Sequence, residues 1–309
     1  MTTETSQCTS GLERKQTDTQ NETTSNQSAK SIDTLVEDIY GLFSGHTCDP
    51  DRVRSFGEQL SQMVAARLDG YSSSREFTLR VSNLGKPDRQ MWYEANDPTT
   101  EELAPHTKFK FMYGDILELL LLFLASEAGH SVSKEQIEVV VNGIKGHIDA
   151  EIDGVVVDCK SASTHSFKKF RDGTLAEDDP FGYMEQLAGY SKGLGGLPGA
   201  FLAVDKQNGH IALMKVPKEE LDALQIEERI DHLRDVVTQP EPPERCYDPV
   251  PEGKSGNMKL AVGCSYCPHK FKCWADSNNG IGLRTFLYSS GPVHLVQVEN
   301  EPRVLEVTF

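Results

Sequence analysis

The 309-residue chain lacks a long uninterrupted apolar run. Its most apolar stretch, residues 116–125, is too short to span a bilayer and contains Glu118. The first residues, MTTETSQCTS, lack the apolar segment of a secretory signal. The sequence also contains no P-loop, no G-x-G-x-x-G and no serine-hydrolase elbow. We therefore expect a cytoplasmic protein without a membrane partner that uses none of these chemistries.

Basic residues are too few for a protein that coats nucleic acid. The 31 Lys and Arg residues against 47 Asp and Glu residues give a formal net charge of −16. Binding to a polyanion would therefore need a local basic groove and not a broad basic surface. The candidate contacts to DNA phosphates are Lys168, Lys169 and Arg171; a solvated loop is the alternative for this stretch.

Cysteine is scarce and clustered. The chain has seven cysteines, an odd number that argues against disulfides in a reducing compartment. Cys264, Cys267 and Cys273 have a spacing that favours metal binding. A closed site needs a fourth ligand, and Cys246 is the first choice. Cys48 and His269 are the alternatives, and His269 would favour zinc. Thiolate chemistry alone allows Zn²⁺ and an iron–sulfur centre equally.

Composition and periodicity divide the chain into four regions. They are a polar, disordered tail (1–30), a helical region (31–108), a core (109–239) and a cysteine region with terminal strands (240–309).

Periodicity also predicts the main elements. Helices are expected at 50–68, after Ser82, and at 113–128, 180–194 and 218–237; strands are expected at 77–81, 136–141, 146–152, 155–159, 200–205, 211–216 and within 283–307. This order predicts an α/β (or α+β) fold in which helices flank a mixed central sheet.

The segment GHIDAEIDGVVVDCKSAS carries the strongest chemical signal. A hairpin at Asp153-Gly154 would fold Asp149 back beside Asp158. Strand geometry places Asp158 and Lys160 on one face, with Cys159 on the other. Two close, buried carboxylates repel each other and are costly to desolvate. A hard cation such as Mg²⁺ or Mn²⁺ removes that penalty, can lower the pKa of a bound water and can stabilise charge on a phosphate.

Glu118 adds a third carboxylate. It lies in the most apolar expected helix, so it needs a partner if it is buried. A metal shared with Asp149 and Asp158 would supply one. The ordinary alternatives are a hairpin aspartate at 149 and a glutamate at the surface end of its helix.

The order of these residues resembles the PD-(D/E)XK nucleases and, within them, the RecB-type exonucleases. The matching positions are Glu118, Asp149, Asp158 and Lys160, followed by Gln186 and Tyr190 in YMEQLAGY. The resemblance implies a restriction-endonuclease-like core. It also implies that the three carboxylates and the backbone carbonyl of Cys159 bind Mg²⁺ or Mn²⁺ and that Lys160 assists. Gln186 and Tyr190 would position the nucleic acid and the lysine.

The cysteines are similar to those of iron–sulfur members of that group. Such members carry three C-terminal cysteines and one far upstream, and in GKPDRQMWY the upstream position is occupied by Pro87. The resemblance implies a [4Fe–4S] cluster, with Zn²⁺ as the alternative, that staples the C-terminal region to the core without taking part in catalysis.

These features together predict a metal-dependent DNase. We expect an exonuclease of DNA recombination, repair or phage DNA processing that acts on single strands or duplex ends. It would work in the cytoplasm, which would be the host cytoplasm if the chain is phage-encoded. A helicase or single-strand-binding protein is the expected partner. The alternatives are a structure-specific endonuclease, a non-catalytic binding module and an interaction subunit of a recombination complex.

Overall fold

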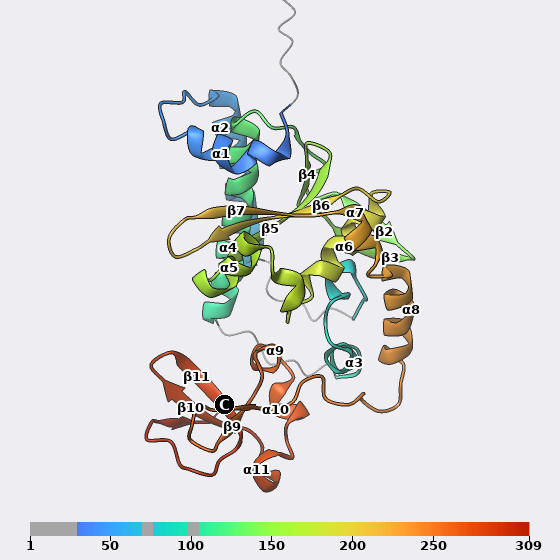
Figure 1. Cartoon of the computed structure of the whole chain (residues 1–309), viewed down its shortest axis with the longest axis vertical. Helices are drawn as coiled ribbons and strands as arrows, with labels where there is room; N and C mark the ends of the chain where they lie inside the picture. The colour runs from blue at the N-terminus through green and yellow to red at the C-terminus, as the bar shows by residue number, and fades with distance from the viewer. Residues whose placement is uncertain (1–29, 70–76, 98–104, 309) are drawn as a thin grey trace, which may run out of the picture.

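The computed structural model describes residues 30–69, 77–97 and 105–308. Apart from Lys30, the tail expected at residues 1–30 lies outside this range. A mixed five-stranded sheet is flanked by helices on both faces, which confirms the expected fold class (Figure 1). Within the described residues, no helix is both long and apolar enough to cross a membrane.

The central sheet has the strand order β1-β4-β5-β6-β7. Its strands are β1 (Val132–Ser133), β4 (Ala150–Ile152), β5 (Val155–Ala162), β6 (Gly199–Asp205) and β7 (Ile211–Val216). Only the central pair, β5 and β6, is parallel among these described strands, and the other neighbours are antiparallel. The crossover between β5 and β6 contains α5 (Thr164–Asp172) and α6 (Tyr183–Gly193).

The predicted hairpin joins β4 to β5. Asp153 and Gly154 both have positive φ angles, 50° and 84°, as a type I′ turn requires. The β-branched run at the start of β5 suits a buried strand. Ala150 pairs with Val157, so Asp149 lies next to Asp158 across the two strands. The turn therefore sets the register that brings two carboxylates together.

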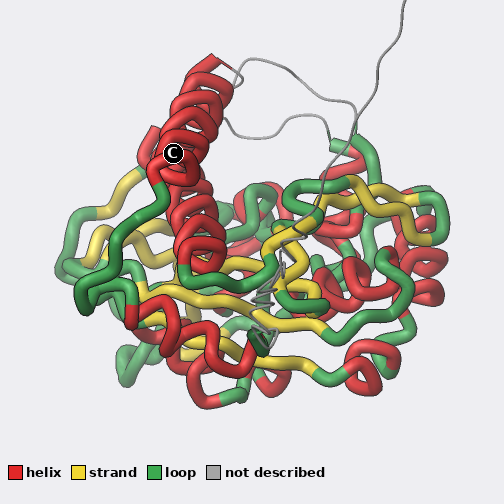
Figure 2. The backbone as a smooth tube through the Cα atoms, turned by 90° about the horizontal axis from the view of Figure 1, so that it is seen from above, coloured by secondary structure: helices red, strands yellow, loops and turns green. Residues whose placement is uncertain are grey.

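Two apolar layers cover the two faces of the sheet. One contains α1 (Leu35–Gly41) and the C-terminal half of α4 (Pro105–Glu127), and Cys159 packs in this layer. The other contains α5, α6, α7 (Lys218–Asp222) and α8 (Ile226–Val237), packed around Phe201. Figure 2 shows the strands running between these helices. Because Cys159 faces the first layer, Asp158 and Lys160 face the second.

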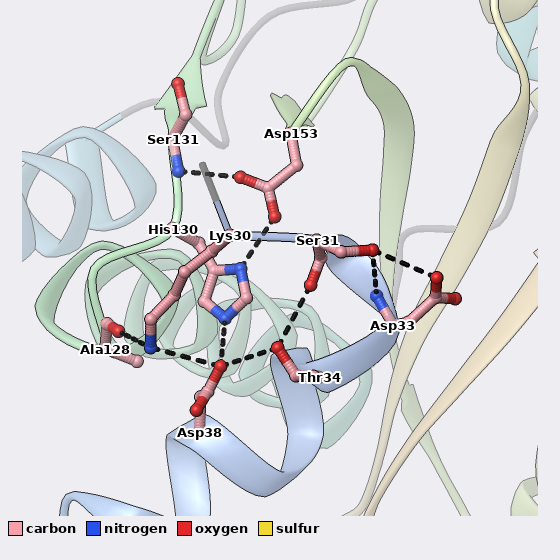
Figure 3. A network of polar contacts seen from close by, with 9 residues as sticks. All are labelled: Lys30, Ser31, Asp33, Thr34, Asp38, Ala128, His130, Ser131 and Asp153. Atoms are coloured by element: carbon pink, nitrogen blue, oxygen red, sulfur yellow. Dashed lines mark hydrogen bonds and ion pairs between the residues drawn. The ribbon is translucent and has the colours of Figure 1, made fainter. Parts of the chain in front are cut away.

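A buried histidine attaches α1 to the sheet (Figure 3). His130 lies between two carboxylates, with Nδ1 2.7 Å from Asp153 Oδ2 and Nε2 3.1 Å from Asp38 Oδ2. Lys30 pairs with the same Asp38 oxygen at 3.1 Å. Since Asp153 belongs to the β4–β5 turn, this network fixes the N-terminal helix against the hairpin formed by β4 and β5.

The C-terminal region forms a second sheet of order β12-β10-β11-β9-β8. Its strands are β8 (Val250–Pro251), β9 (Met258–Lys259), β10 (Arg284–Tyr288), β11 (Gly291–Gln297) and β12 (Glu306–Val307). Three short helices lie beside it (Figure 1): α9 (Val262–Ser265), α10 (Lys270–Cys273) and α11 (Ser277–Gly280). Leu260, Trp274 and Val296 form a small core of their own.

Two strand predictions were wrong. The single strand expected at 146–152 is two strands, because β3 (Ile144–His147) pairs with β2 (Glu138–Val141) in a separate ribbon. Gly146 belongs to that ribbon, where a side chain would collide with Val81. The strand expected at 77–81 is a loop ending in a 3-10 turn at Val81–Asn83.

The helices also differ from expectation. The basic stretch containing Lys168 is helix α5, not a loop, because Phe167 and Phe170 anchor it to the core. The helix expected at 218–237 divides into α7 and α8 at Gln225, whose φ of 47° is left-handed. Helix α2 (Pro50–Asp69) agrees with the prediction. The expected region boundary at residue 108 falls inside α4, and the helix expected after Ser82 is α3 (Asp88–Asn96).

Candidate functional site

Three carboxylates and one lysine converge from separate elements. Asp158 and Lys160 lie on β5, Asp149 directly precedes β4, and Glu118 lies on α4. Asp158 is 1% exposed, and the side chain of Lys160 is 17% exposed. The hairpin and the long helix thus gather the four residues that the sequence singled out.

Each of these side chains has a distinct contact. Lys160 Nζ lies 2.5 Å from Asp158 Oδ2, and the Cys159 backbone N–H donates to Asp149 Oδ2 at 2.7 Å. Gln136 Nε2 donates to Glu118 Oε1 at 2.6 Å. Glu118 therefore sits at the more open edge of the group, while Asp149 is tied to the strand of Asp158.

The acidic groups shift one another's titration. Burial, followed by the charges of Asp158 and Asp115, raises the pKa of Glu118 to about 7. Burial and the Asp158 and Glu118 charges raise the pKa of Asp149 well above its ordinary value. Burial also raises the pKa of Asp158, although Lys160 opposes the shift. Excess negative charge is thus held in a space that one ammonium group does not neutralise.

The pKa of Lys160 moves in the opposite direction from that of a lone buried amine. Burial lowers the pKa of the ammonium, but the charges of Asp158 and Asp149 outweigh burial and the net pKa is raised. Lys160 therefore remains protonated at neutral pH, which makes it a donor or a positive charge and not a base.

The donor set suits a hard divalent cation. Buried Asp158 Oδ2 already contacts the Lys160 ammonium at 2.5 Å, so a bound cation would share this carboxylate with the lysine. The oxygens of Glu118, Asp149 and Asp158 do not form a described group that lies entirely within 4.8 Å. Mg²⁺ commonly keeps several waters and takes one or two carboxylates. The three carboxyl groups therefore supply oxygen donors of the kind that such an ion takes.

Helix α6 presents the predicted glutamine and tyrosine to this group. Lys160 Nζ lies 3.5 Å from Gln186 Oε1, and Gln186 Nε2 donates to Tyr190 Oη at 2.9 Å. Burial, then the Asp158 charge, raises the pKa of Tyr190, so its hydroxyl stays protonated. The pair orients the lysine through one chain of hydrogen bonds.

Sequence reasoning missed Tyr183. Lys160 Nζ lies 4.6 Å from the centre of its ring, a cation–π contact at the start of α6. Its spacing of three residues from Gln186 on a helix was the available signal, because such residues share a face. Asp179 precedes it, and its Oδ2 accepts the Met184 N–H at 2.8 Å, which fixes the start of the helix.

The three predicted DNA contacts lie on α5. Lys169 pairs with Asp178 at 2.6 Å and Arg171 with Asp172 at 2.8 Å, whereas Lys168 is exposed. Neighbouring carboxylates therefore already neutralise two of the three charges.

The four cysteines expected to bind metal line one pocket. Cys246, Cys264, Cys267 and Cys273 border it together with Pro87. Pro87, which occupies the place expected for an upstream cysteine, thus lines this pocket, and Cys246 lines the same space from a different part of the chain. Cys48 lies elsewhere, beside His46 and Glu127.

N–H donors surround these sulfur atoms. Arg89 Nε donates to Cys273 Sγ at 3.1 Å, and the backbone N–H groups of Arg89 and Gln90 face Cys246. The Trp274 ring N–H donates a hydrogen bond to Cys264. The His269 backbone N–H donates one to Cys267. Burial raises the pKa of Cys267 to about 11, so its metal-free thiol is neutral. Such donors stabilise bound thiolates and tune iron–sulfur centres.

Comparison with known proteins gives distant structural likenesses. No protein-family model and no curated protein matches the sequence. The crystal structure of SSO0001 aligns with a TM-score of 0.40 and 20% identity, covering 68% of this chain and 91% of that chain. An alkaline exonuclease (LHK-Exo) from Laribacter hongkongensis aligns with a TM-score of 0.37 and 14% identity, covering 57% of this chain and 92% of that chain. Neither likeness is strong enough to assign a function. A functional assignment therefore depends on the side chains of the site.

Proposed function

We propose that this chain is a metal-dependent nuclease that hydrolyses phosphodiester bonds in DNA. One observation carries the proposal: the buried Asp158 carboxylate pairs with Lys160 at 2.5 Å and, by its charge, raises the pKa values of the neighbouring carboxyl groups of Asp149 and Glu118. Groups with perturbed pKa values that converge in this way mark sites of chemistry.

The carboxylates would hold Mg²⁺ or Mn²⁺. Asp149 and Asp158, with the backbone carbonyl of Cys159, are the proposed direct ligands, and Glu118 with Gln136 would hold a water beside them. A bound divalent cation would lower the pKa of a water and stabilise negative charge on the phosphate.

Lys160 would contact the substrate. Its raised pKa keeps the charge needed to bind a phosphate oxygen, and Gln186 and Tyr183 restrict where the ammonium points. A preorganised charge in a site with little water stabilises developing negative charge more strongly than a solvated one.

We further infer an exonuclease of DNA recombination, repair or phage DNA processing, acting in the cytoplasm on single strands or duplex ends. The order Glu118, Asp149, Asp158, Lys160, Gln186 and Tyr190, which resembles the RecB type, supports this narrower assignment. A helicase or single-strand-binding protein is the proposed partner. A structure-specific endonuclease is the alternative.

We also propose that the four cysteines hold a [4Fe–4S] cluster. No three of these sulfurs lie within 4.8 Å of one another in the described structure. Sulfurs on one Zn²⁺ are separated by about 3.8 Å, given tetrahedral bonds of about 2.3 Å. The ligands of a cluster bind separate irons and lie further apart. The wider spacing therefore favours the cluster over Zn²⁺, the alternative.

Cleavage of labelled DNA tests the nuclease proposal. Linear and circular single strands would be incubated with Mg²⁺, Mn²⁺ or EDTA. We expect metal-dependent loss of the linear substrate, no cleavage by Asp158→Asn, and normal cleavage by Asp235→Asn, which changes an exposed aspartate on α8. Cleavage of the circle would replace the exonuclease by an endonuclease. DNA binding by the folded wild type without cleavage under any condition would refute the enzyme and favour a binding module.

A further inference from the structure

A second group of metal-ligating side chains contains none of the proposed nuclease residues. His46 and Cys48 belong to the segment between α1 and α2, and Glu127 ends α4. One nitrogen, one sulfur and one oxygen from these residues all lie within 4.8 Å of one another. Within the described ranges, no other set of three histidine, cysteine or acidic residues meets this spacing.

Glu127 is the buried centre of this group. Its side chain is only 3% exposed. His46 Nε2 and the Asp49 backbone N–H each lie 2.7 Å from Oε1. Among the described residues, Oε2 has no hydrogen-bond donor, although Arg52 Nη1 lies 3.7 Å away as a looser ion pair. A buried carboxylate oxygen without a donor is unfavourable, so a further ligand is expected there.

We propose that His46, Cys48 and Glu127 bind one Zn²⁺ ion. A mixed nitrogen, sulfur and oxygen set suits Zn²⁺ and does not suit Mg²⁺, which prefers oxygen ligands. Zn²⁺ bonds are about 2.0–2.3 Å long, so ligands within 4.8 Å of one another need to close by about 1 Å. Three protein ligands leave the fourth tetrahedral position for water.

The proposed ion would tie the α1–α2 segment to the C-terminal end of α4. Arg52 also faces this site, because its Nη1 lies 3.7 Å from Glu127 Oε2. Arg52 Nε in turn lies 3.8 Å from Asp49 Oδ2. Arg52 competes with the ion for Glu127 Oε2 because both are cations. Removing Arg52 should therefore strengthen metal binding, whereas removing a ligand should weaken it. This pair of opposite effects separates a metal site from an ordinary ion pair.

Cobalt binding tests the site independently of nuclease activity. The full-length protein would be treated with EDTA and titrated with Co²⁺, which gives a thiolate-to-metal absorption band, and then with Zn²⁺ by calorimetry. We expect Cys48→Ser and Glu127→Gln to lose one binding site or to weaken it by about 100-fold or more, beyond the usual loss for an outer-shell partner. Arg52→Gln should tighten it. Asp51→Asn, an exposed neighbour, is the matched control.

Each outcome decides the proposal. Loss of the Cys48-dependent absorption with retained circular dichroism supports it. The proposal is overturned if Cys48→Ser binds as much Co²⁺ as the wild type and gives the same absorption. It is also overturned if the Arg52→Gln and Glu127→Gln variants both bind metal with the affinity of the wild type.

An independent observation concerns aromatic rings beside Lys160. The Tyr183 ring lies 5.6 Å from Phe181, and Phe181 lies 5.8 Å from Tyr266. Phe181 is 41% exposed and Tyr266 is 73% exposed. The rings therefore lead from the catalytic lysine to the surface. Tyr266 lies between Cys264 and Cys267, so the cysteine segment supplies the outermost ring.

We infer that Phe181 and Tyr266 stack against the bases of a single DNA strand, an inference that rests on the proposed nuclease function. Exposed aromatic rings bind unpaired bases with little sequence preference, at about 1–3 kcal/mol per base. A paired duplex hides its base faces, so this row favours a single strand at the site. The negative net charge makes stacking more important, because a broad basic surface is missing.

Binding in a non-cleaving background tests this inference. Asp158→Asn protein would be titrated with a single strand carrying 2-aminopurine, whose fluorescence falls on stacking. We expect Tyr266→Ala and Phe181→Ala each to weaken binding by about 5- to 150-fold and to reduce the quenching, following the energy above. Phe43→Ala, which removes an exposed ring elsewhere, should bind normally. Normal affinity and quenching in both variants would overturn the inference, even if the parent protein cleaves DNA.

Discussion

Lys160 is the residue on which the chemistry of the site depends. It is the cation closest to Asp158, at 2.5 Å, and its pKa is raised by both neighbouring aspartates. The same amine limits repulsion in the metal-free protein and, in the proposed nuclease, would also offer its charge to a phosphate. These effects can be separated, because stability is measured without DNA.

Replacing Lys160 with methionine should destabilise the metal-free protein by about 3–5 kcal/mol, the cost of leaving a buried charge without its partner. Added Mg²⁺ should recover a larger share of stability in this variant than in the wild type, since a cation would compensate Asp158. Urea unfolding with EDTA and with Mg²⁺ measures both. Equal Mg²⁺ effects in the two proteins would contradict the assignment of the carboxylates as ligands.

Packing between elements holds α6 close to the sheet side of the site. Gly189 has no room for a side chain: an added Cβ would lie 2.6 Å from Val81 Cγ1 and 2.8 Å from Leu84 Cδ1. Because Gly189 stands between Gln186 and Tyr190, a shift of the helix at this point moves both. The close approach of α6 to the 3-10 turn at 81–83 thus helps position Lys160.

Gly189→Ala should therefore lower the free energy of unfolding by about 1–3 kcal/mol through overpacking. The matched control is Gly57→Ala in α2, where the described structure has no atom within 4 Å of the added Cβ. That change should stabilise by about 0.4–1 kcal/mol through backbone entropy. Chemical denaturation of the two variants distinguishes the effects, and an unaltered or increased stability of Gly189→Ala would refute the packing argument.

The second sheet contains a buried histidine on β11. Burial, and secondarily the Lys270 charge, lowers the pKa of His294 from 6.5 to about 4, and Thr285 Oγ1 lies 2.8 Å from its Nδ1. Between these two pH values the unfolded chain binds more protons than the folded protein. The free energy of unfolding should therefore fall as the pH is lowered from about 6.5 to 4, by up to about 3 kcal/mol.

Unfolding followed at several pH values checks this prediction. In His294→Gln the free energy of unfolding should change much less between pH 6.5 and 4 than it does in the wild type. His210→Gln, which changes an exposed histidine, should show the same fall in the free energy of unfolding as the wild type. The same slope in His294→Gln and in the wild type would assign the decline to other groups.

The hairpin and the i, i+4 pair could be predicted because both are local. Asp153-Gly154 determines its own turn, and helical spacing alone puts Gln186 beside Tyr190. Tertiary contacts decided the rest. Ile144–His147 left the main sheet because Gly146 packs against Val81, which is far away in sequence. Helix α5 was missed because its apolar anchors, Phe167 and Phe170, are separated by basic residues. His46 and Glu127 meet only when α1 packs against α4.

At the scale of the whole molecule, the cysteine region is attached to the core through α3. Arg89 donates to Cys273 Sγ and to the Pro243 carbonyl, and Trp92 Nε1 donates to the Gln239 carbonyl at 2.8 Å. Arg245 lies over the Trp274 ring at 4.1 Å, and both residues line the same pocket. The proposed cluster therefore stands at the junction of the two parts.

Cys246→Ser should lose iron and the absorbance of a cluster, and its C-terminal region should become more sensitive to proteolysis. Metal binding and folding are coupled in such sites, so the loss of a ligand removes stability as well as metal. Iron content and limited proteolysis measure the two effects. Cys48→Ser is the control and should keep its iron; retention of a full iron complement by Cys246→Ser would exclude it as the fourth ligand.

The origin of the fourth thiol has a consequence for the order of assembly. All four sulfurs lie within residues 246–273, whereas a ligand at position 87 would have required the distant N-terminal half. A cofactor held in this way would be loaded by one short contiguous segment. Maturation of that segment would then be uncoupled from folding of the part that carries the proposed nuclease site, and Arg89 would join two parts that formed separately.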